Sequence, residues 1–274
     1  MENDLSMGAA WMNGKVLPIS QAMIPVNDWG LVHSDITYDV VPVIDGAFFR
    51  FGEYLARFLS SMENLHLDPG MSKRDIQAAL HQMVGKSSLR DSYVAMVCSR
   101  GKPKIAGSRD PRDCENHFFA WCVPYVHIIK PEIVKQGATA WIAQNAYRIP
   151  ENSVNPLVKN YHWGDFTQGI FEAKDKDYET VILLDYDGNV TEGPGFNVFA
   201  VKDKVLITPD RGVLAGVSRK TVLEMADYLG INTSVRPLSV EELLEADEVF
   251  LSSSGGGVIP IIRVNETIFG NGAS

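Results

Sequence analysis

The sequence predicts an α+β protein of two domains, and three observations support this prediction. The chain has 274 residues, roughly 1.8 times the length of a typical domain of about 150 residues. Hydrophobic residues make up 45% and charged residues 22% of it, as in globular proteins that bury a sizeable core. Strand-like segments are followed by helix-like segments, and this succession occurs twice. We expect one domain at residues 1–129 and a second at 130–274, joined at Lys130-Pro131-Glu132.

Three dipeptides predict two-residue hairpin turns, because their residues readily adopt the positive φ angles that such turns need: Asn13-Gly14, Asp45-Gly46 and Asp187-Gly188. Strand-like residues flank these turns. The segments expected to be strands are 38–44, 47–51, 180–185, 189–192, 196–201 and 205–208. Each domain should therefore contain a mixed or antiparallel sheet, or a barrel, with flanking helices.

Apolar residues spaced i, i+3, i+4 and i+7 predict two helices in the N-terminal half, at about 53–67 and from Ser72 onward. These residues are Leu55, Phe58, Leu59, Met62 and Leu65 in the first, and Ile76, Leu80, Met83 and Val84 in the second. In the C-terminal half, Ser218 is the predicted N-cap of a helix that ends at Gly230. Ser239 and Glu242 form a capping box that predicts a short fourth helix.

Charge and cysteine content exclude several classes of function. The net charge of −9 argues against nucleic acid or an anionic membrane as partner. The three cysteines, Cys98, Cys114 and Cys122, have no metal-ligand spacing, so we expect reduced thiols and no metal site. The N-terminus has no apolar signal segment, and the most apolar run, 118–126, is too short to span a bilayer. A cytoplasmic protein is expected.

Two segments have the composition of an anion-binding loop. Residues 212–218 run from a turn directly into a predicted helix, so free backbone N–H groups and the positive end of the helix dipole would meet there. Residues 252–257 are three serines followed by three glycines, whose backbone can approach a phosphate closely. Each segment could instead be a plain helix cap or a flexible loop. Neither matches a nucleotide P-loop.

Three titratable residues stand out by their sequence context. Lys159 lies in an apolar, aromatic-rich segment, where desolvation would lower the pKa of its amine and make it nucleophilic. Its alternative is a lysine that extends to solvent from a strand edge. Glu192 precedes a rigid turn and could equally be an ordinary loop glutamate. His33 could be a general base or a histidine held by structural hydrogen bonds.

In combination, these segments resemble the class IV, or fold-type IV, pyridoxal-phosphate aminotransferases, which include branched-chain and D-amino-acid aminotransferases. The resemblance covers about residues 10–262. Its motifs are Val158-Lys159-Asn160-Tyr161, Thr191-Glu192-Gly193, Phe196-Asn197, residues 212–219 and Ser253-Ser254. Within the family, residues 33–40 are most similar to the (R)-selective amine transaminases.

The resemblance implies a homodimeric enzyme with pyridoxal 5′-phosphate in the cleft between its two domains. Lys159 would form the Schiff base with the cofactor, and Glu192 would keep the pyridine nitrogen protonated. Arg57 would reach the phosphate from the first helix. The other residues that the resemblance assigns to cofactor binding are Phe196, Asn197, Val217, Ser218, Ser253 and Ser254.

The resemblance also implies substrates, namely an (R)-amine or amino acid as donor and a keto acid such as pyruvate as acceptor. Branched-chain relatives usually carry an arginine shortly after the counterpart of Tyr38, whereas residues 39–42 here are Asp-Val-Val-Pro, which favours an apolar pocket. D-amino-acid and (R)-amine relatives carry an arginine in the loop after Ser-Arg-Gly, where this chain has Ala106. Lys102, Lys104 and Arg109 are the possible substitutes. The expected substrate-binding residues are His33, Tyr38, Val40, Trp163, Lys104 and Arg109.

Three alternatives remain open within the same fold. They are a D-amino-acid or branched-chain aminotransferase, an aminodeoxychorismate lyase that catalyses β-elimination, and a pyridoxal-phosphate-binding relative without turnover. Members of the family usually continue past the final hairpin with a glycine-rich turn and a helix, which this sequence, ending at Ser274, does not show.

Overall fold

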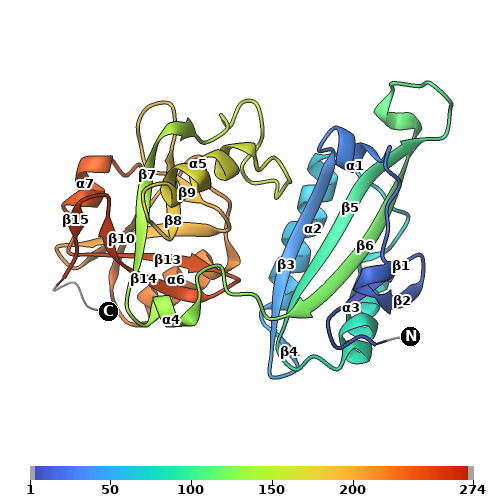
Figure 1. Cartoon of the computed structure of the whole chain (residues 1–274), viewed down its shortest axis with the longest axis horizontal. Helices are drawn as coiled ribbons and strands as arrows, with labels where there is room; N and C mark the ends of the chain where they lie inside the picture. Colours follow the sequence, from blue (N-terminus) through green and yellow to red (C-terminus); the bar gives the residue numbers. More distant parts are fainter. Residues whose placement is uncertain (1–3, 271–274) are drawn as a thin grey trace. The chain divides into compact units, whose positions relative to one another are not determined.

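The computed structural model describes residues 4–270, which fold into two compact units (Figure 1). The first unit contains the chain up to Val126 and also Val158–His162, and the second contains His127–Leu157 and the chain from Trp163 onward. The sequence placed 158–162 in the C-terminal domain. The structure places it in the first unit because its backbone bonds to a strand there: the Thr37 hydroxyl donates to the carbonyl oxygen of Lys159 at 2.6 Å.

The first unit is built on a six-stranded antiparallel sheet with the order β2-β1-β6-β5-β3-β4. Its strands are β1 (Ala9–Met12), β2 (Lys15–Pro18), β3 (Ile36–Ile44), β4 (Ala47–Phe48), β5 (Ser92–Pro103) and β6 (Cys114–Pro124). The predicted turns Asn13-Gly14 and Asp45-Gly46 join β1 to β2 and β3 to β4, and all four of their residues have positive φ.

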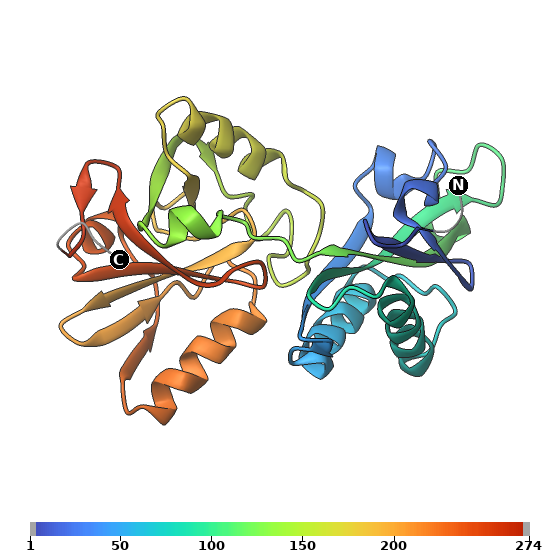
Figure 2. The same cartoon turned by 60° about the horizontal axis from the view of Figure 1, so that its bottom comes forward.

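Two helices cover one face of this sheet, α2 (Phe51–Asn64) and α3 (Lys73–Ser87), as Figure 2 shows. Ser72 begins α3 with a reciprocal capping box to Asp75. Most of the apolar stripe predicted for each helix is buried, with Phe58 and Leu80 completely inaccessible. Leu59, Leu65 and Val84 are half-buried. The remaining helical segments of the unit are η1 (Ile19–Gln21), α1 (Trp29–Val32) and η2 (Pro111–Asp113).

The second unit contains a nine-stranded mixed sheet in which β7–β8, β7–β14 and β11–β12 pair in parallel. The main path is β12-β11-β10-β13-β14-β7-β8, with β9 on β10 and β15 on β14. The strands are β7 (Ala138–Tyr147), β8 (Thr180–Leu184), β9 (Glu192–Gly193), β10 (Phe196–Lys202), β11 (Val205–Thr208), β12 (Asn232–Val235), β13 (Glu248–Ser253), β14 (Gly257–Val264) and β15 (Thr267–Ile268).

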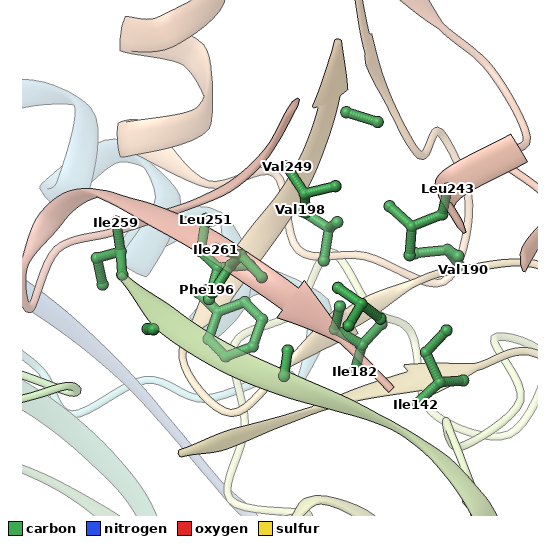
Figure 3. Close-up of a cluster of buried hydrophobic side chains, with 14 of the residues drawn as sticks. Ile142, Ile182, Val190, Phe196, Val198, Leu243, Val249, Leu251, Ile259 and Ile261 are labelled. Atoms are coloured by element: carbon green, nitrogen blue, oxygen red, sulfur yellow. The ribbon is translucent and has the colours of Figure 1, made fainter. Parts of the chain in front are cut away.

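Side chains of alternate strand residues form the main core of the second unit, in which Ile182, Val198 and Leu251 are fully buried (Figure 3). The intervening residues point to the other face of the sheet. There Leu183 packs with Phe166 of α5 (Gly164–Lys174). Ala226 of α6 (Val217–Tyr228) packs in a cluster that Phe199 and Phe250 also join. The short helices α4 (Pro131–Val134) and α7 (Val240–Leu244) contribute to the main core.

The structure corrects four local expectations. Lys130-Pro131-Glu132 is the N-terminal end of α4 and not an extended linker, because Pro131 is a favourable first residue of a helix. Gly216, not Ser218, is the N-cap of α6. Strand β13 extends to Ser253, so the serine–glycine loop begins at Ser254. After Asp187-Gly188 the predicted strand pairing is reduced to a single bridge.

None of the helices within residues 4–270 is long and apolar enough to cross a membrane.

Candidate active site

Lys159 is held against β3 by its main chain. Its carbonyl oxygen accepts hydrogen bonds from the Thr37 hydroxyl at 2.6 Å and from the Tyr38 N–H at 3.3 Å. Its own N–H donates to the hydroxyl of Ser61 on α2 at 3.3 Å, and Asn160 forms an antiparallel bridge with Thr37. The lysine is therefore fixed at the backbone although its segment is a loop.

The amine of Lys159 lies over an aromatic ring. Its Nζ is 4.5 Å from the centroid of the Tyr38 ring. The ring of Tyr161 stacks on Tyr38 with a centroid distance of 4.2 Å and an interplanar angle of 11°. The sequence placed Tyr38 in a substrate pocket, and the structure brings it to the lysine.

Arg57 is turned toward the sheet rather than toward solvent. Its Nε and Nη2 donate to the two carboxylate oxygens of Asp39 at 2.8 and 2.7 Å, and Asp39 is completely buried. Burial opposes the charge of Arg57, but the charge of Asp39 and its hydrogen bonds outweigh this effect and raise the pKa of the guanidinium. The sequence did not identify Asp39, because its partner lies 18 positions later, on another element.

Glu192, in the second unit, is a buried carboxylate with donors on both oxygens. Oε1 accepts from Arg148 Nε at 3.2 Å. Oε2 accepts from the Leu214 N–H at 2.8 Å and lies 3.4 Å from the side-chain amide nitrogen of Asn197. These donors stabilise the negative charge of Glu192 in a position where burial alone would oppose it.

Arg148 connects Glu192 to a second buried carboxylate. Its Nη1 donates to Asp165 Oδ2 at 2.5 Å, and its guanidinium lies 4.3 Å from the centroid of the Phe166 ring. The side chains of the three charged residues are between 6% and 10% exposed. Two carboxylates and one guanidinium leave this cluster with one excess negative charge. No motif or spacing in the sequence pointed to Arg148 or Asp165.

The N-terminus of α6 lies in the segment 212–218, which the sequence predicted to be an anion-binding helix end. Its N-cap is Gly216. Within residues 4–270, no side chain forms a capping hydrogen bond at this helix end. A Cβ at Gly216 would lie 2.1 Å from the Asn197 side-chain oxygen, so only glycine fits. Ser252 pairs with Asn197 across β10 and β13, and its buried hydroxyl has no hydrogen-bond partner within residues 4–270.

The serines of the predicted phosphate cup differ in their surroundings. The Ser253 hydroxyl donates to the Gly195 carbonyl oxygen at 2.8 Å and accepts from the Gly255 N–H at 3.0 Å, so it shapes the loop. Ser254 is half-buried at the end of β13, and Ser218 lies in the first turn of α6. Val217 and Phe196 are buried.

The predicted substrate residues are brought together only in part. Tyr38 and Val40 share one apolar cluster on the sheet face opposite α2 and α3. Trp163 packs edge-on against Phe166 in the second unit. His33 is exposed at the end of α1, with its ring against Trp29. The possible substitutes for the missing arginine, Lys102, Lys104 and Arg109, are all exposed in or beside the loop after β5.

The base of that loop is tied down by a network that the sequence did not predict. Asp28 accepts from the Ser99 hydroxyl on one oxygen and is 2.6 Å from His117 Nε2 on the other. The next residue after Ser99, Arg100, donates to Asp35 at 2.9 Å and to the carbonyl of His66 at 2.8 Å.

Each unit, taken by itself, contains groups whose chemistry matches one part of a cofactor with an aldehyde, a basic ring nitrogen and a phosphate. Lys159 offers an amine, the Glu192 cluster offers an excess negative charge, and α6 offers an uncapped positive helix end. No group of three or more histidine, cysteine, aspartate or glutamate side chains within residues 4–270 could hold a metal ion.

Comparison with known proteins matches this chain to aminotransferases. The family described as amino-transferase class IV matches residues 37–264. The D-alanine aminotransferase of Bacillus licheniformis is 28% identical over 268 residues, covering 95% of this chain and 90% of that protein. The branched-chain-amino-acid aminotransferase of Escherichia coli K12 is 26% identical over 271 residues, covering 96% and 86%.

Solved structures agree with this result. The crystal structure of the Escherichia coli branched-chain amino acid aminotransferase superposes with a TM-score of 0.90 at 25% identity, covering 97% of this chain and 89% of that one. The branched-chain aminotransferase of Thermoproteus uzoniensis, solved with norvaline, gives a TM-score of 0.87 at 25% identity and covers 96% and 89%.

Proposed function

Because this chain belongs to the class IV aminotransferases, we propose that it transfers the amino group of an (R)-amine or a related amino acid to a keto acid such as pyruvate. The family assignment confirms the pyridoxal-phosphate-dependent aminotransferase and the fold-type IV architecture that the motifs predicted. The donor is a separate question, since the relatives are named for branched-chain amino acids and for D-alanine.

Each part of the cofactor has a counterpart among the residues. Bound pyridoxal phosphate supplies a ring that withdraws electrons from the substrate carbon. We assign Lys159 to the covalent bond with the cofactor and to carrying the proton of the substrate carbon. Glu192, with its excess negative charge shared with Arg148 and Asp165, would hold the proton on the pyridine nitrogen. The α6 N-terminus and Arg57 would bind the phosphate.

The observation that favours an amine donor is the character of the surface beside Lys159. The cluster that contains Tyr38 and Val40 consists only of aliphatic and aromatic side chains. Its members are Ile36, Tyr38, Val40, Ala95 and Val97, with Tyr93, Phe119 and Trp121 packed against them. Such a surface favours an aryl or alkyl substituent on the donor over a carboxylate, whose burial without a cationic partner is costly.

Amino acids are the second candidate donors, because the named relatives are branched-chain and D-alanine aminotransferases. A screen of single donors separates these possibilities. The protein is saturated with pyridoxal phosphate and mixed with (R)- or (S)-1-phenylethylamine, D-alanine or L-leucine, and the visible absorbance of the bound cofactor is followed. We expect the (R)-amine to remove this absorbance fastest. Faster loss with D-alanine or L-leucine would assign the enzyme to amino acids.

Two further arms test the remaining alternatives. An aminodeoxychorismate lyase would release pyruvate from aminodeoxychorismate when no keto acid is added. A protein without turnover would keep its absorbance with every donor. In Lys159→Ala, borohydride should no longer fix the cofactor to the protein and transamination should be lost. Full activity of that variant would contradict the assigned role of Lys159.

We also propose that the protein is a homodimer, as the resemblance implies. Sedimentation velocity measurements on the active enzyme test this directly. An active species with the mass of one chain would rule the dimer out.

A further inference from the structure

We propose that the ring of Tyr38 stabilises the ammonium form of Lys159, and that Tyr161 keeps this ring in place. The inference rests on the proposed function, in which Lys159 accepts a proton from the substrate carbon. Its starting point is the distance of 4.5 Å between Lys159 Nζ and the centroid of the Tyr38 ring. This lies within the range of about 6 Å over which an aromatic face attracts a cation.

The backbone imposes this approach. The N–H of Tyr38 itself donates to the carbonyl oxygen of Lys159, and the hydroxyl of the preceding Thr37 donates to the same oxygen. From α2, the hydroxyl of Ser61 accepts the Lys159 N–H. The main chain of Lys159 is therefore fixed next to the main chain of Tyr38. The amine can move away from the ring only by rotation within the lysine side chain.

The stacked ring of Tyr161 restrains Tyr38 on one face. At a centroid distance of 4.2 Å and an angle of 11°, this face is closed to other groups. The amine of Lys159 consequently has the other face. Tyr38 is 6% exposed, so little water competes with the ring for the cation, and the attraction is stronger than at an exposed site.

The charged groups around Tyr38 largely balance one another. Arg57 is close enough for Tyr38 to influence its pKa, and it is paired with the buried Asp39 at 2.7 Å. Burial is the main factor that raises the pKa of the neighbouring phenols Tyr93 and Tyr161, so both stay neutral at physiological pH. The ring of Tyr38 acts on the charge of the lysine amine at short range.

The proton transfer shows where this stabilisation acts. When the C–H bond of the substrate breaks, Nζ of Lys159 would take up the proton in a new N–H bond, and the bound cofactor would supply the group that accepts the electron pair. The neutral amine would become an ammonium ion. Lys159 would be neutral again once it had given this proton up. Tyr38 stabilises only the charged form and does not compete for the proton, so it lowers the energy of the protonated lysine.

A series of ring substitutions at position 38 tests the proposal. Tyr38 is replaced by phenylalanine and by phenylalanines that carry one, two or three fluorines, which withdraw electrons from the ring face at nearly constant shape. The rate of proton transfer is measured from the isotope effect of a donor deuterated at its reacting carbon. This rate should fall steadily along the series, by about 2- to 30-fold in total. The same series at Tyr228, an exposed ring at the C-terminal end of α6, should leave the rate unchanged.

A second measurement does not depend on turnover. In the full-length protein freed of cofactor, the pH dependence of Lys159 carbamoylation by cyanate, read by mass spectrometry, gives the pKa of the amine. Because a cation–π contact favours the charged form, the pKa should fall by about 0.4–1.5 pH units from the phenylalanine to the trifluorinated variant. Tyr161→Leu should also lower the pKa of the Lys159 amine. Tyr161→Phe, which keeps a stacked ring, should leave this pKa at its wild-type value.

Two results would overturn the inference. In the first, the fluorinated variants fold, but neither the pKa of the Lys159 amine nor the rate of proton transfer changes along the series. The second is an amine pKa that rises along it. Failure of the proposed function looks different, because Lys159→Ala would then still exchange the proton of the donor whatever ring stands at position 38.

Discussion

Arg148 and Glu192 form an ion pair in the interior of the second unit, with Nε of the arginine 3.2 Å from Oε1 of the glutamate. The same guanidinium holds Asp165 at 2.5 Å. Arg148 thus bonds to two buried carboxylates and fixes the orientation of the one that we assign to the pyridine nitrogen.

Removal of this arginine should therefore strongly destabilise the second unit. In Arg148→Met both carboxylates lose their cationic partner while they stay buried, which we expect to cost about 3–5 kcal/mol of the free energy of unfolding. Urea denaturation measures this loss. Arg90→Met, which removes an exposed partner of Asp45, is the control and should cost at most about 1 kcal/mol. A loss below about 1 kcal/mol in Arg148→Met would contradict the arrangement.

The charge of Glu192 should matter more than its shape. Glu192→Gln keeps the size and the contact to Leu214 but removes the charge that would hold the pyridine proton. The loss of one charge-assisted hydrogen bond, about 1.5–3 kcal/mol, corresponds to a fall in kcat/KM of roughly 10- to 150-fold. Steady-state kinetics with the preferred donor measure it. Glu224→Gln on the exposed side of α6 should behave like the wild type, and an equally active Glu192→Gln would remove the glutamate from the mechanism.

The N-cap of α6 allows only glycine. In Gly216→Ala the new methyl group would lie 2.1 Å from the Asn197 oxygen, so the helix end must move. We expect a cost of about 1–3 kcal/mol in stability and a weaker affinity for pyridoxal phosphate, measured by equilibrium dialysis.

A second glycine in a helix provides the matched control. Gly85 lies inside α3, and a Cβ there would meet no atom within 4 Å. Gly85→Ala should therefore stabilise the protein by about 0.5–1 kcal/mol through better helix propensity, with no change in cofactor affinity. Equal effects of the two substitutions would show that crowding at Gly216 is unimportant.

Asp28 should make the stability of the first unit depend on pH. Burial opposes its ionisation, but the hydrogen bonds from His117, Ser99 and the Gly30 N–H outweigh burial and hold the pKa of this carboxyl below its ordinary 3.8. Because the pKa is lower in the folded state, ionised Asp28 contributes stability above pH 3.8, and the contribution disappears as the pH falls through the folded-state pKa.

The substitution Asp28→Asn tests this sign. Its loss of stability, about 1–3 kcal/mol, should be complete near neutral pH and should shrink as the pH is lowered from about 5 to 3. Thermal unfolding across this range is the measurement. Asp227→Asn, at an exposed position of α6, should show no comparable trend. A stability difference for Asp28→Asn that is constant with pH would mean that its charge is not involved.

Local chemistry made several features predictable from the sequence alone. The Asn13-Gly14 and Asp45-Gly46 turns form as predicted, because a residue pair in direct succession determines the φ angles of a two-residue turn. Ser72 caps α3 through a residue three positions away. The family follows from motifs that are each short and continuous, such as Thr191-Glu192-Gly193.

The tertiary structure decided which side chains meet. Glu192 and Arg148 are 44 positions apart. They lie together because the N–H of Arg148 bonds to Leu184 of β8, while the N–H of Thr191, the neighbour of Glu192, bonds to Leu183 of the same strand. Lys159 and Tyr38 are 121 positions apart, yet the hydrogen bonds of the Lys159 carbonyl oxygen to Thr37 and Tyr38 of β3 bring the amine over the ring. Turns and caps depend on neighbours in the chain, whereas these pairs depend on strand register and packing, and a shift of one residue in register would separate them. The sequence alone therefore predicted roles for the lysine and the glutamate, and only the fold supplied the side chains that surround them.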